Sequence, residues 1–245
     1  MSDINLKDFI KDLESLNEEN TVSVKVPSCG KSFKFKLINV SQHKDLLKSA
    51  FEGYEGVIRS NVIFNDIIIK NSEEEYSFSL LDKVPILLQL RKASIGDNIT
   101  ISGEKYKISD LPDVEDVFED STTVEYNGIE VALKVPSLER DDKMSNKLIG
   151  EFHKLSDKDK DTEAINLVLT YEIIKFVESV TINGSTFVFD EYNAYECKKL
   201  IDALPLKLNN MIIEFITNFK AFENKSLTFD DDTVLEIDAG FLSSE

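Results

Sequence analysis

The chain has 245 residues, of which 42% are hydrophobic and 30% charged, which is enough apolar matter for one large core or two smaller ones. Its 28 basic and 46 acidic residues give a formal net charge of −18, which repels phosphate backbones and anionic lipid, so we expect no nucleic-acid and no membrane partner. No apolar run reaches the roughly 20 residues of a membrane span, and 9 Gly and 5 Pro exclude a low-complexity chain.

The first part of the chain predicts a helix, a hairpin and two further helices. Residues 1–20 place apolar side chains at helical spacing and lack the basic-then-apolar order of a signal peptide. Alternating apolar residues over 21–37 predict a β-hairpin around the turn residues 27–31. Residues 41–51 and 54–69 then return to helical spacing.

A proline decides what we expect of the next helix. Because Pro85 is tolerated in the first turn of a helix, we expect a break near Asp82 and a helix that starts near Pro85 and ends at residues 94–97. Residues 98–108 predict a small hairpin. Residues 109–121 are strongly acidic and indicate a solvated connection, with the docking of a basic partner as the alternative.

The second half is predicted to be mostly helical. Asn-Gly pairs at 127–128 and 183–184 lie between alternating runs and predict two hairpins. Helical spacing covers 138–155 and 164–180, with a charged linker over 156–161 between these two helices.

The last segments predict two more helices and a terminal pair of strands. Residues 192–203 are helical, Pro205 opens a final helix that ends at about Phe222, and 227–229 pair with 234–237. The predicted fold class is therefore α+β, with several β-hairpins alternating with helices and a predominantly helical second half. The predicted regions are an N-terminal helix (1–20), a hairpin-and-helix region (21–155) and a helical C-terminal region with a terminal β-hairpin (162–245). The alternative is that the two larger regions form one packed unit.

The tetrad Lys-Val-Pro-Ser occurs twice, at 25–28 and at 134–137. In both places an alternating strand ends at a proline, which cannot donate a hydrogen bond to a strand ladder. The repeat indicates either an internal duplication of a hairpin module or two strands that end in a common way.

Residues with catalytic potential are few and scattered. The sequence has no P-loop, no dinucleotide-binding glycine motif, no nucleophile elbow and no HExxH. His43 and His153 lie on unrelated predicted helices, Cys29 lies in a turn, and Cys197 is expected to be a small core residue. Asp230–Asp232 could ligate Ca²⁺ or Mg²⁺ but lacks the spacing of an EF-hand, and a hairpin turn explains it as well.

We therefore expect no enzyme, no cofactor and no metal, and a protein that acts by binding. The alternative to a binding protein is an enzyme with an unfamiliar site. A polar cleft in which carboxylates with shifted pKa values converge would favour this alternative. The helix over 164–180 is the most apolar in the chain and is expected to be buried or to form an interface. The predicted interface residues, on this helix and the hairpin after it, are Ile165, Val168, Leu169, Ile173, Phe176, Val177, Phe187 and Phe189.

The order of segments resembles the baseplate hub and hub-assembly family of T4-type contractile-tailed bacteriophages. The resemblance covers residues 20–240. It is carried by the first hairpin (24–37), by the helix that begins near Val40-Ser41, by the hairpin, helix and proline break over 180–205, and by the C-terminal strand pair. Members of that family often carry a CPxCG-type zinc-ribbon turn in the last hairpin. This sequence has Asp230–Asp232 there, so we predict no zinc.

The resemblance implies a component or assembly factor of the central hub of a phage tail baseplate, bound to other hub proteins. It also implies a location in the host cytoplasm during assembly, or in the virion tail. Within this function, the protein could remain in the baseplate or leave it as a chaperone. The alternative class is a non-phage acidic binding or regulatory module without catalysis.

Overall fold

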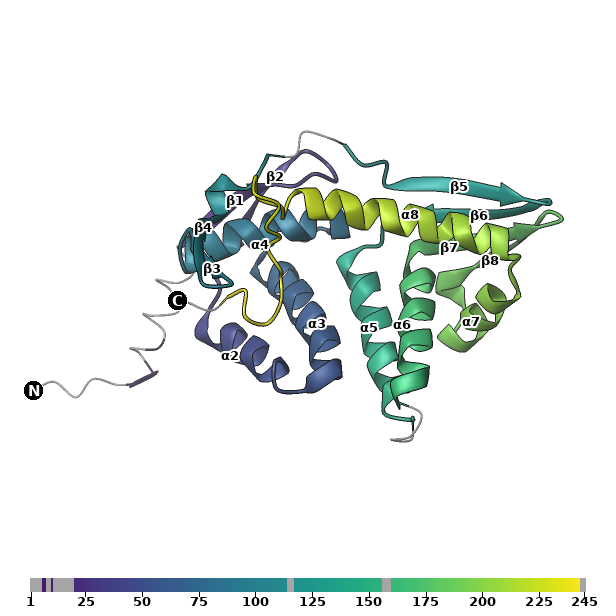
Figure 1. Cartoon of the computed structure of the whole chain (residues 1–245), viewed down its shortest axis with the longest axis horizontal. Helices are drawn as coiled ribbons and strands as arrows, with labels where there is room; N and C mark the ends of the chain where they lie inside the picture. The colour runs from purple at the N-terminus through teal and green to yellow at the C-terminus, as the bar shows by residue number, and fades with distance from the viewer. Residues whose placement is uncertain (1–5, 8–9, 11–19, 114–116, 156–159, 243–245) are drawn as a thin grey trace, which may run out of the picture.

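The computed structural model describes residues 6–7, 10, 20–113, 117–155 and 160–242. Four helices lie side by side below two that cross above them (Figure 1). The four are α2 (Val40–Ser49), α3 (Gly53–Asn71), α5 (Leu138–Phe152) and α6 (Lys160–Phe176). The crossing helices are α4 (Leu80–Ser94) and α8 (Leu206–Lys225), and α7 (Ala194–Ala203) packs against α6.

The strands form antiparallel hairpins at the two ends of the molecule (Figure 1). At one end are two separate hairpins, β1 (Thr21–Lys25) with β2 (Ser32–Lys36) and β3 (Asn98–Ile101) with β4 (Glu104–Lys107). At the other end is a four-stranded sheet in the order β5 (Ser121–Tyr126), β6 (Ile129–Lys134), β7 (Val177–Ile182) and β8 (Ser185–Val188). The α+β class and the four predicted central hairpins are confirmed.

Helix α4 differs from the prediction at its start. It begins at Leu80 and continues through Pro85, so the expected break near Asp82 is wrong. Ser79 is the N-cap, its hydroxyl accepts the Leu81 N–H at 3.1 Å, and the Asp82 carboxylate accepts the Ser79 N–H at 2.9 Å. This reciprocal cap stabilises the first turn ahead of the proline, which is why the helix starts there.

The segment after α6 also differs. The helix expected over 164–180 ends at Phe176, and Val177 already belongs to β7, where Val180 pairs with Val131 of β6. Arg140 of α5 fixes this junction because its guanidinium donates to the carbonyl oxygens of Lys175 and Val177 at 2.8 and 2.7 Å. The Lys175 carbonyl belongs to the last turn of α6, where backbone carbonyls have no partner within the helix.

The predicted terminal strand pair is reduced to one bridge between Thr228 and Val234. The backbone N–H groups of Phe229 and Leu235 donate to the carbonyls of Thr233 and Leu227 at 2.9 and 2.8 Å. The N-terminal helix predicted over 1–20 lies almost wholly outside the described residues.

The two Lys-Val-Pro-Ser tetrads both reach the start of α4 but take different positions in their hairpins. In the first, which leads into the turn after β1, the Ser28 N–H and hydroxyl donate to the Asp82 carboxylate at 2.9 and 2.7 Å. In the second, which leads from β6 into α5, the Pro136 carbonyl accepts the Leu80 N–H at 3.0 Å and Ser137 caps α5. The tetrads are therefore not equivalent parts of a duplicated module.

One cluster of buried apolar side chains extends through all of these elements. Phe35 of β2, Phe64 of α3, Phe176 of α6 and Phe219 of α8 are among its largest fully buried members. In the part of the chain that is described, no helix combines the length and apolarity that a membrane crossing requires.

Candidate functional site

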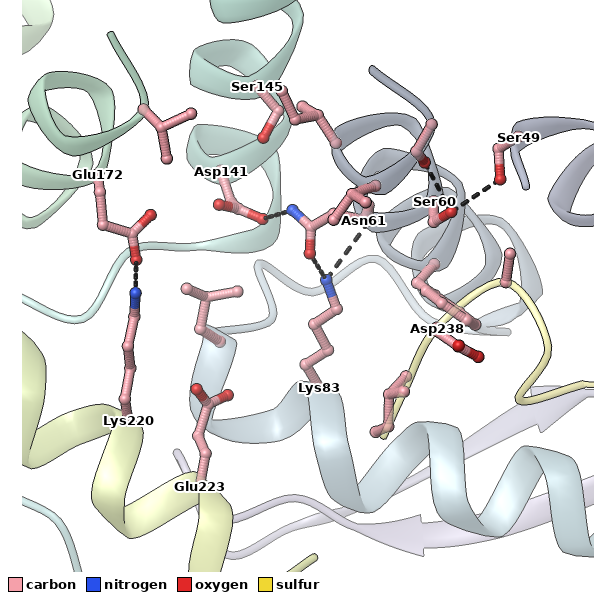
Figure 2. A pocket seen from close by; sticks show the side chains of 18 of the residues that line it. Ser49, Ser60, Asn61, Lys83, Asp141, Ser145, Glu172, Lys220, Glu223 and Asp238 are labelled. Atoms are coloured by element: carbon pink, nitrogen blue, oxygen red, sulfur yellow. Dashed lines mark hydrogen bonds and ion pairs between the residues drawn. The ribbon is translucent and has the colours of Figure 1, made fainter. Parts of the chain in front are cut away.

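A groove of about 640 Å³ lies between the helix pairs α2–α3 and α5–α6, below α4 and α8, with residues 237–240 along one side (Figures 1 and 2). This volume is in the range of ligand-binding sites. The charged residues that line the groove are Lys83, Asp141, Glu172, Lys175, Lys220, Glu223 and Asp238.

Small residues shape one end of the groove, where α3 starts against the end of α2. A Cβ atom on Gly56 would lie 1.9 Å from the Ser49 carbonyl oxygen, so only glycine fits this approach. The hydroxyl oxygens of Ser49 and Ser60 lie 2.7 Å apart, and the Ser60 hydroxyl also donates to the Gly56 carbonyl at 2.8 Å. These contacts hold the two helices close together, and both buried serines line the groove.

Asp141 of α5 is fully buried and has a partner at each oxygen. Its Oδ1 accepts from Lys175 Nζ at 2.8 Å, and its Oδ2 accepts from Asn61 Nδ2 and Asn65 Nδ2 at 2.6 and 2.8 Å. Burial alone would raise the pKa of this carboxyl, but the charges of Lys175 and Lys83 outweigh it and hold the pKa well below its usual range. Asp141 is therefore ionised and joins α3, α5 and α6.

Lys175 and Glu172 extend this network along α6 to α8. Burial opposes the charge of Lys175, but Asp141 and Glu172 together raise its pKa well above the usual range. Glu172 contacts Lys175 at 2.7 Å and Lys220 of α8 at 2.8 Å. Burial would raise the pKa of the Glu172 carboxyl, and the two lysines lower it instead. In this series of ion pairs, from Asp141 through Lys175 and Glu172 to Lys220, each charged group contacts a group of opposite charge.

Lys83 of α4 is buried and reaches across the groove to α3. Its Nζ donates to the side-chain and backbone oxygens of Asn61 (Figure 2). Burial lowers the pKa of Lys83 to about 8, although nearby Asp141 acts in the opposite direction. Its ammonium group is therefore held by neutral oxygens and by a more distant carboxylate.

Glu223 of α8 points into the groove (Figure 2). Within the described part of the chain, its carboxylate makes no hydrogen bond or ion pair. Burial raises its pKa to about 7, against the opposing charges of Lys83 and Lys175. At neutral pH the Glu223 carboxyl therefore lies near the midpoint of its titration.

The groove thus brings together carboxyls with shifted pKa values, the feature that would favour an enzyme. However, Asp141 and Glu172 are occupied by lysines. Among the residues that the structure places, no histidine or cysteine lines the groove. Glu223 and Asp238 contact no lysine within the described residues, and this arrangement by itself identifies no particular reaction.

The family follows from comparison with known proteins. A protein-family model described as T4 bacteriophage base plate protein matches residues 19–226, which is most of the chain. The chain belongs to this family. Searches of curated proteins and of solved structures found no match. Membership of this family makes the chain a phage baseplate protein, which decides against the non-phage alternative.

The interface residues predicted for this baseplate protein fall into two groups. Half of them are buried in the core: Ile173, Phe176, Val177 and Phe189. Ile165 and Leu169 are exposed on α6, and Val168 between them lines the groove. Phe187 is half-buried and stacks on Tyr192 with ring centroids 3.8 Å apart. The interface prediction therefore narrows to the exposed side of α6 and the edge of the β7–β8 hairpin.

The remaining candidates take structural positions. Cys197 is buried, as predicted, and Cys29 is exposed. His153 is exposed and contacts Glu55 at 2.5 Å. Asp231 accepts from the Tyr106 hydroxyl at 3.0 Å and from the Thr233 N–H at 3.0 Å. Across the described ranges, no group of three or more His, Cys, Asp or Glu side chains is arranged to hold a metal ion.

The charged groove residues were not predicted from the sequence. The available signal was a charge inside an apolar run: Lys83 lies within Leu80–Leu88, and Lys175 lies between Ile174 and Phe176. Such a lysine must find a partner in the core or reach solvent. Asp141 gave a weaker signal because it lies in a strongly charged stretch, Glu139–Lys143.

Proposed function

We propose that this baseplate protein is a component or an assembly factor of the baseplate hub, and that it acts by protein–protein binding without catalysis. The observation that carries the proposal is a set of exposed apolar side chains on the two helix pairs. Phe51 and Val57, at the α2–α3 end, are 90% and 72% exposed. Ile165 and Leu169 of α6 are 59% and 57% exposed.

These residues belong to one side of the molecule. The contact between His153, after α5, and Glu55, in the first turn of α3, joins the ends of the two helix pairs. Figure 1 shows both ends pointing away from α4 and α8. Exposed apolar residues grouped in this way are typical of binding surfaces, and the net charge of −18 keeps the free subunit soluble in the host cytoplasm until it binds.

Binding to purified baseplate proteins of the same phage tests the proposal. We expect the wild-type protein to bind at least one hub protein, and the Ile165→Ser/Leu169→Ser variant to bind it at least about tenfold more weakly. Leu206→Ser is the matched control, because Leu206 is also exposed but lies in the first turn of α8. Equal affinity of all three proteins, or binding to wedge proteins only, would contradict the proposal.

Mass spectrometry of purified virions separates a hub component from an assembly factor. A hub component is present in mature particles at a fixed ratio to the other hub proteins. An assembly factor is present in infected cells and absent from mature particles.

A further inference from the structure

Glu223 is a groove carboxyl that contacts no cation directly within the described residues, although the charges of Lys83 and Lys175 act on it from a distance. The other carboxylates at the centre of the groove, Asp141 and Glu172, each contact a lysine directly. Those lysines are thereby occupied, and Lys83, whose Nζ is held by Asn61, acts on Glu223 only through its charge and not by contact. Glu223 faces the groove without a partner in the described part of the chain, so an additional cation would complete the arrangement.

The surroundings of Glu223 favour a cation over an anion. The groove is lined by three lysines and four carboxylates, and the fourth carboxylate, Asp238, lies on the opposite wall. Among the described residues, one oxygen of Asp238 has a partner, the Gly240 N–H at 2.8 Å. A guanidinium or ammonium group that enters here could meet Glu223 on α8 and Asp238 on the C-terminal segment (Figure 2). The net charge of −18 would also attract a basic partner.

A stripe of α6 side chains, apolar at its outer end (Ile165 and Val168) and charged further in (Glu172 and Lys175), leads from the exposed surface into this site. Val168, Glu172 and Lys175 of α6 line the groove at helical spacing, and Ile165 continues the same stripe one turn earlier, outside the groove. Val57 of α3 is exposed and also lines the groove. An amphipathic helix with apolar residues and one basic residue at i, i+3 or i+4 could therefore contact both the stripe and Glu223.

We propose that the groove is the docking site for an amphipathic segment of another baseplate protein, and that a lysine or arginine of this segment enters the groove and pairs with Glu223. This inference rests on the proposed binding function and adds the site and the chemistry of the partner. The net charge of the whole chain argues against a second copy as the occupant, because two copies with a net charge of −18 each repel one another.

The test compares two charge-removing variants on the same helix. Glu223→Gln removes the groove carboxylate, while Glu214→Gln removes an exposed carboxylate of α8 that does not line the groove. Each of the other baseplate proteins of the same phage, purified singly, is titrated into wild type and both variants by isothermal calorimetry. Thermal unfolding confirms that each variant is folded, and Glu223→Gln breaks no hydrogen bond within the described chain.

We expect Glu223→Gln to weaken binding of the partner at least about tenfold, and Glu214→Gln to weaken it less than twofold. The paired basic residue is then identified in the partner by changing its lysines and arginines to methionine one at a time. The residue that pairs with Glu223 is the one whose replacement weakens binding to wild type but causes no further loss of affinity for Glu223→Gln.

Three other outcomes overturn the inference in distinguishable ways. Equal loss in the two glutamine variants means that only general charge attraction acts, and it leaves the proposed function standing. Self-association that depends on Glu223, measured by sedimentation velocity, means that the occupant is a second copy. Absence of binding between wild type and every baseplate protein overturns the proposed function itself.

Discussion

Replacing Asp141 with alanine is expected to destabilise the protein by about 3–5 kcal/mol. The carboxylate is fully buried, pairs with Lys175 at 2.8 Å and accepts hydrogen bonds from Asn61 and Asn65. Removing one partner of a buried ion pair typically costs about 3–5 kcal/mol, because the remaining charge stays buried without compensation. Lys175 keeps Glu172, which limits the loss, whereas the two amide groups lose an acceptor, which adds to it.

Urea denaturation, followed by both circular dichroism and fluorescence of the tyrosines, measures this loss. The matched control is Asp45→Ala, which breaks an exposed pair with Lys48 and is expected to change the unfolding free energy by less than about 0.5 kcal/mol. Asp141→Asn keeps the side-chain volume, so a loss close to that of Asp141→Ala would assign the effect to charge and hydrogen bonding, not to a cavity.

A loss below about 1 kcal/mol for Asp141→Ala would refute the reasoning. It would mean that water reaches the pair readily, or that Lys175 is satisfied by Glu172 alone. Because Asp141 joins α3, α5 and α6, we also expect the wild-type protein to unfold in one transition seen equally by both probes.

Three further substitutions test other parts of the structure by the same denaturation assay. Gly56→Ala is expected to cost about 1–3 kcal/mol because its Cβ would lie 1.9 Å from a backbone oxygen of α2, whereas Gly150→Ala, with nothing within 4 Å, is expected to be neutral or stabilising. Arg91→Ala is expected to cost about 2–3 kcal/mol and to expose the C-terminal segment to proteases, because the buried Arg91 donates to the Phe241 carbonyl at 2.8 Å. For Glu223→Gln the expected effect depends on pH. Burial raises the pKa of Glu223 from 4.5 to about 7, so between these pH values the folded state binds more protons than the unfolded state. The unfolding free energy of wild type therefore falls as pH rises through this range. The variant lacks this fall, and at pH 8 its unfolding free energy should exceed that of wild type by up to about 3 kcal/mol.

Local signals in the sequence predicted most of the fold. The Asn-Gly pairs predicted hairpins because both turn residues take a positive φ, and in the structure Asn127 and Asn183 have φ of 53° and 51°. The reciprocal cap at the start of α4 was missed, although Ser79 and Asp82 have the spacing of such a cap, because Pro85 dominated the interpretation. The junction at Val177 was missed because its strand forms only against β6, from a distant part of the sequence.

The charged groove could not be predicted because its contacts are all long-range. Asp141 meets residues 76 and 80 positions before it and 34 positions after it, so no local periodicity brings these side chains together. The sequence predicted that the apolar helix over 164–180 is either buried or part of an interface, since a helix with little polar surface must be covered by something. It could not separate the two outcomes, because which side of the helix meets the core depends on the neighbouring helices.

Glu223 connects stability and binding in a way that separates the docking proposal from a purely structural role. An ionised carboxyl that is half-buried without a partner weakens the fold, which is the usual cost of a site that is complete only when a ligand is present. Glu223→Gln should therefore raise the unfolding free energy at pH 8 and lower the affinity for a basic partner. A structural role predicts that both quantities fall together, and a solvent-exposed bystander predicts that neither changes. Opposite signs for these two measurements on Glu223→Gln, together with an unchanged affinity of Glu214→Gln, are therefore what the docking proposal predicts.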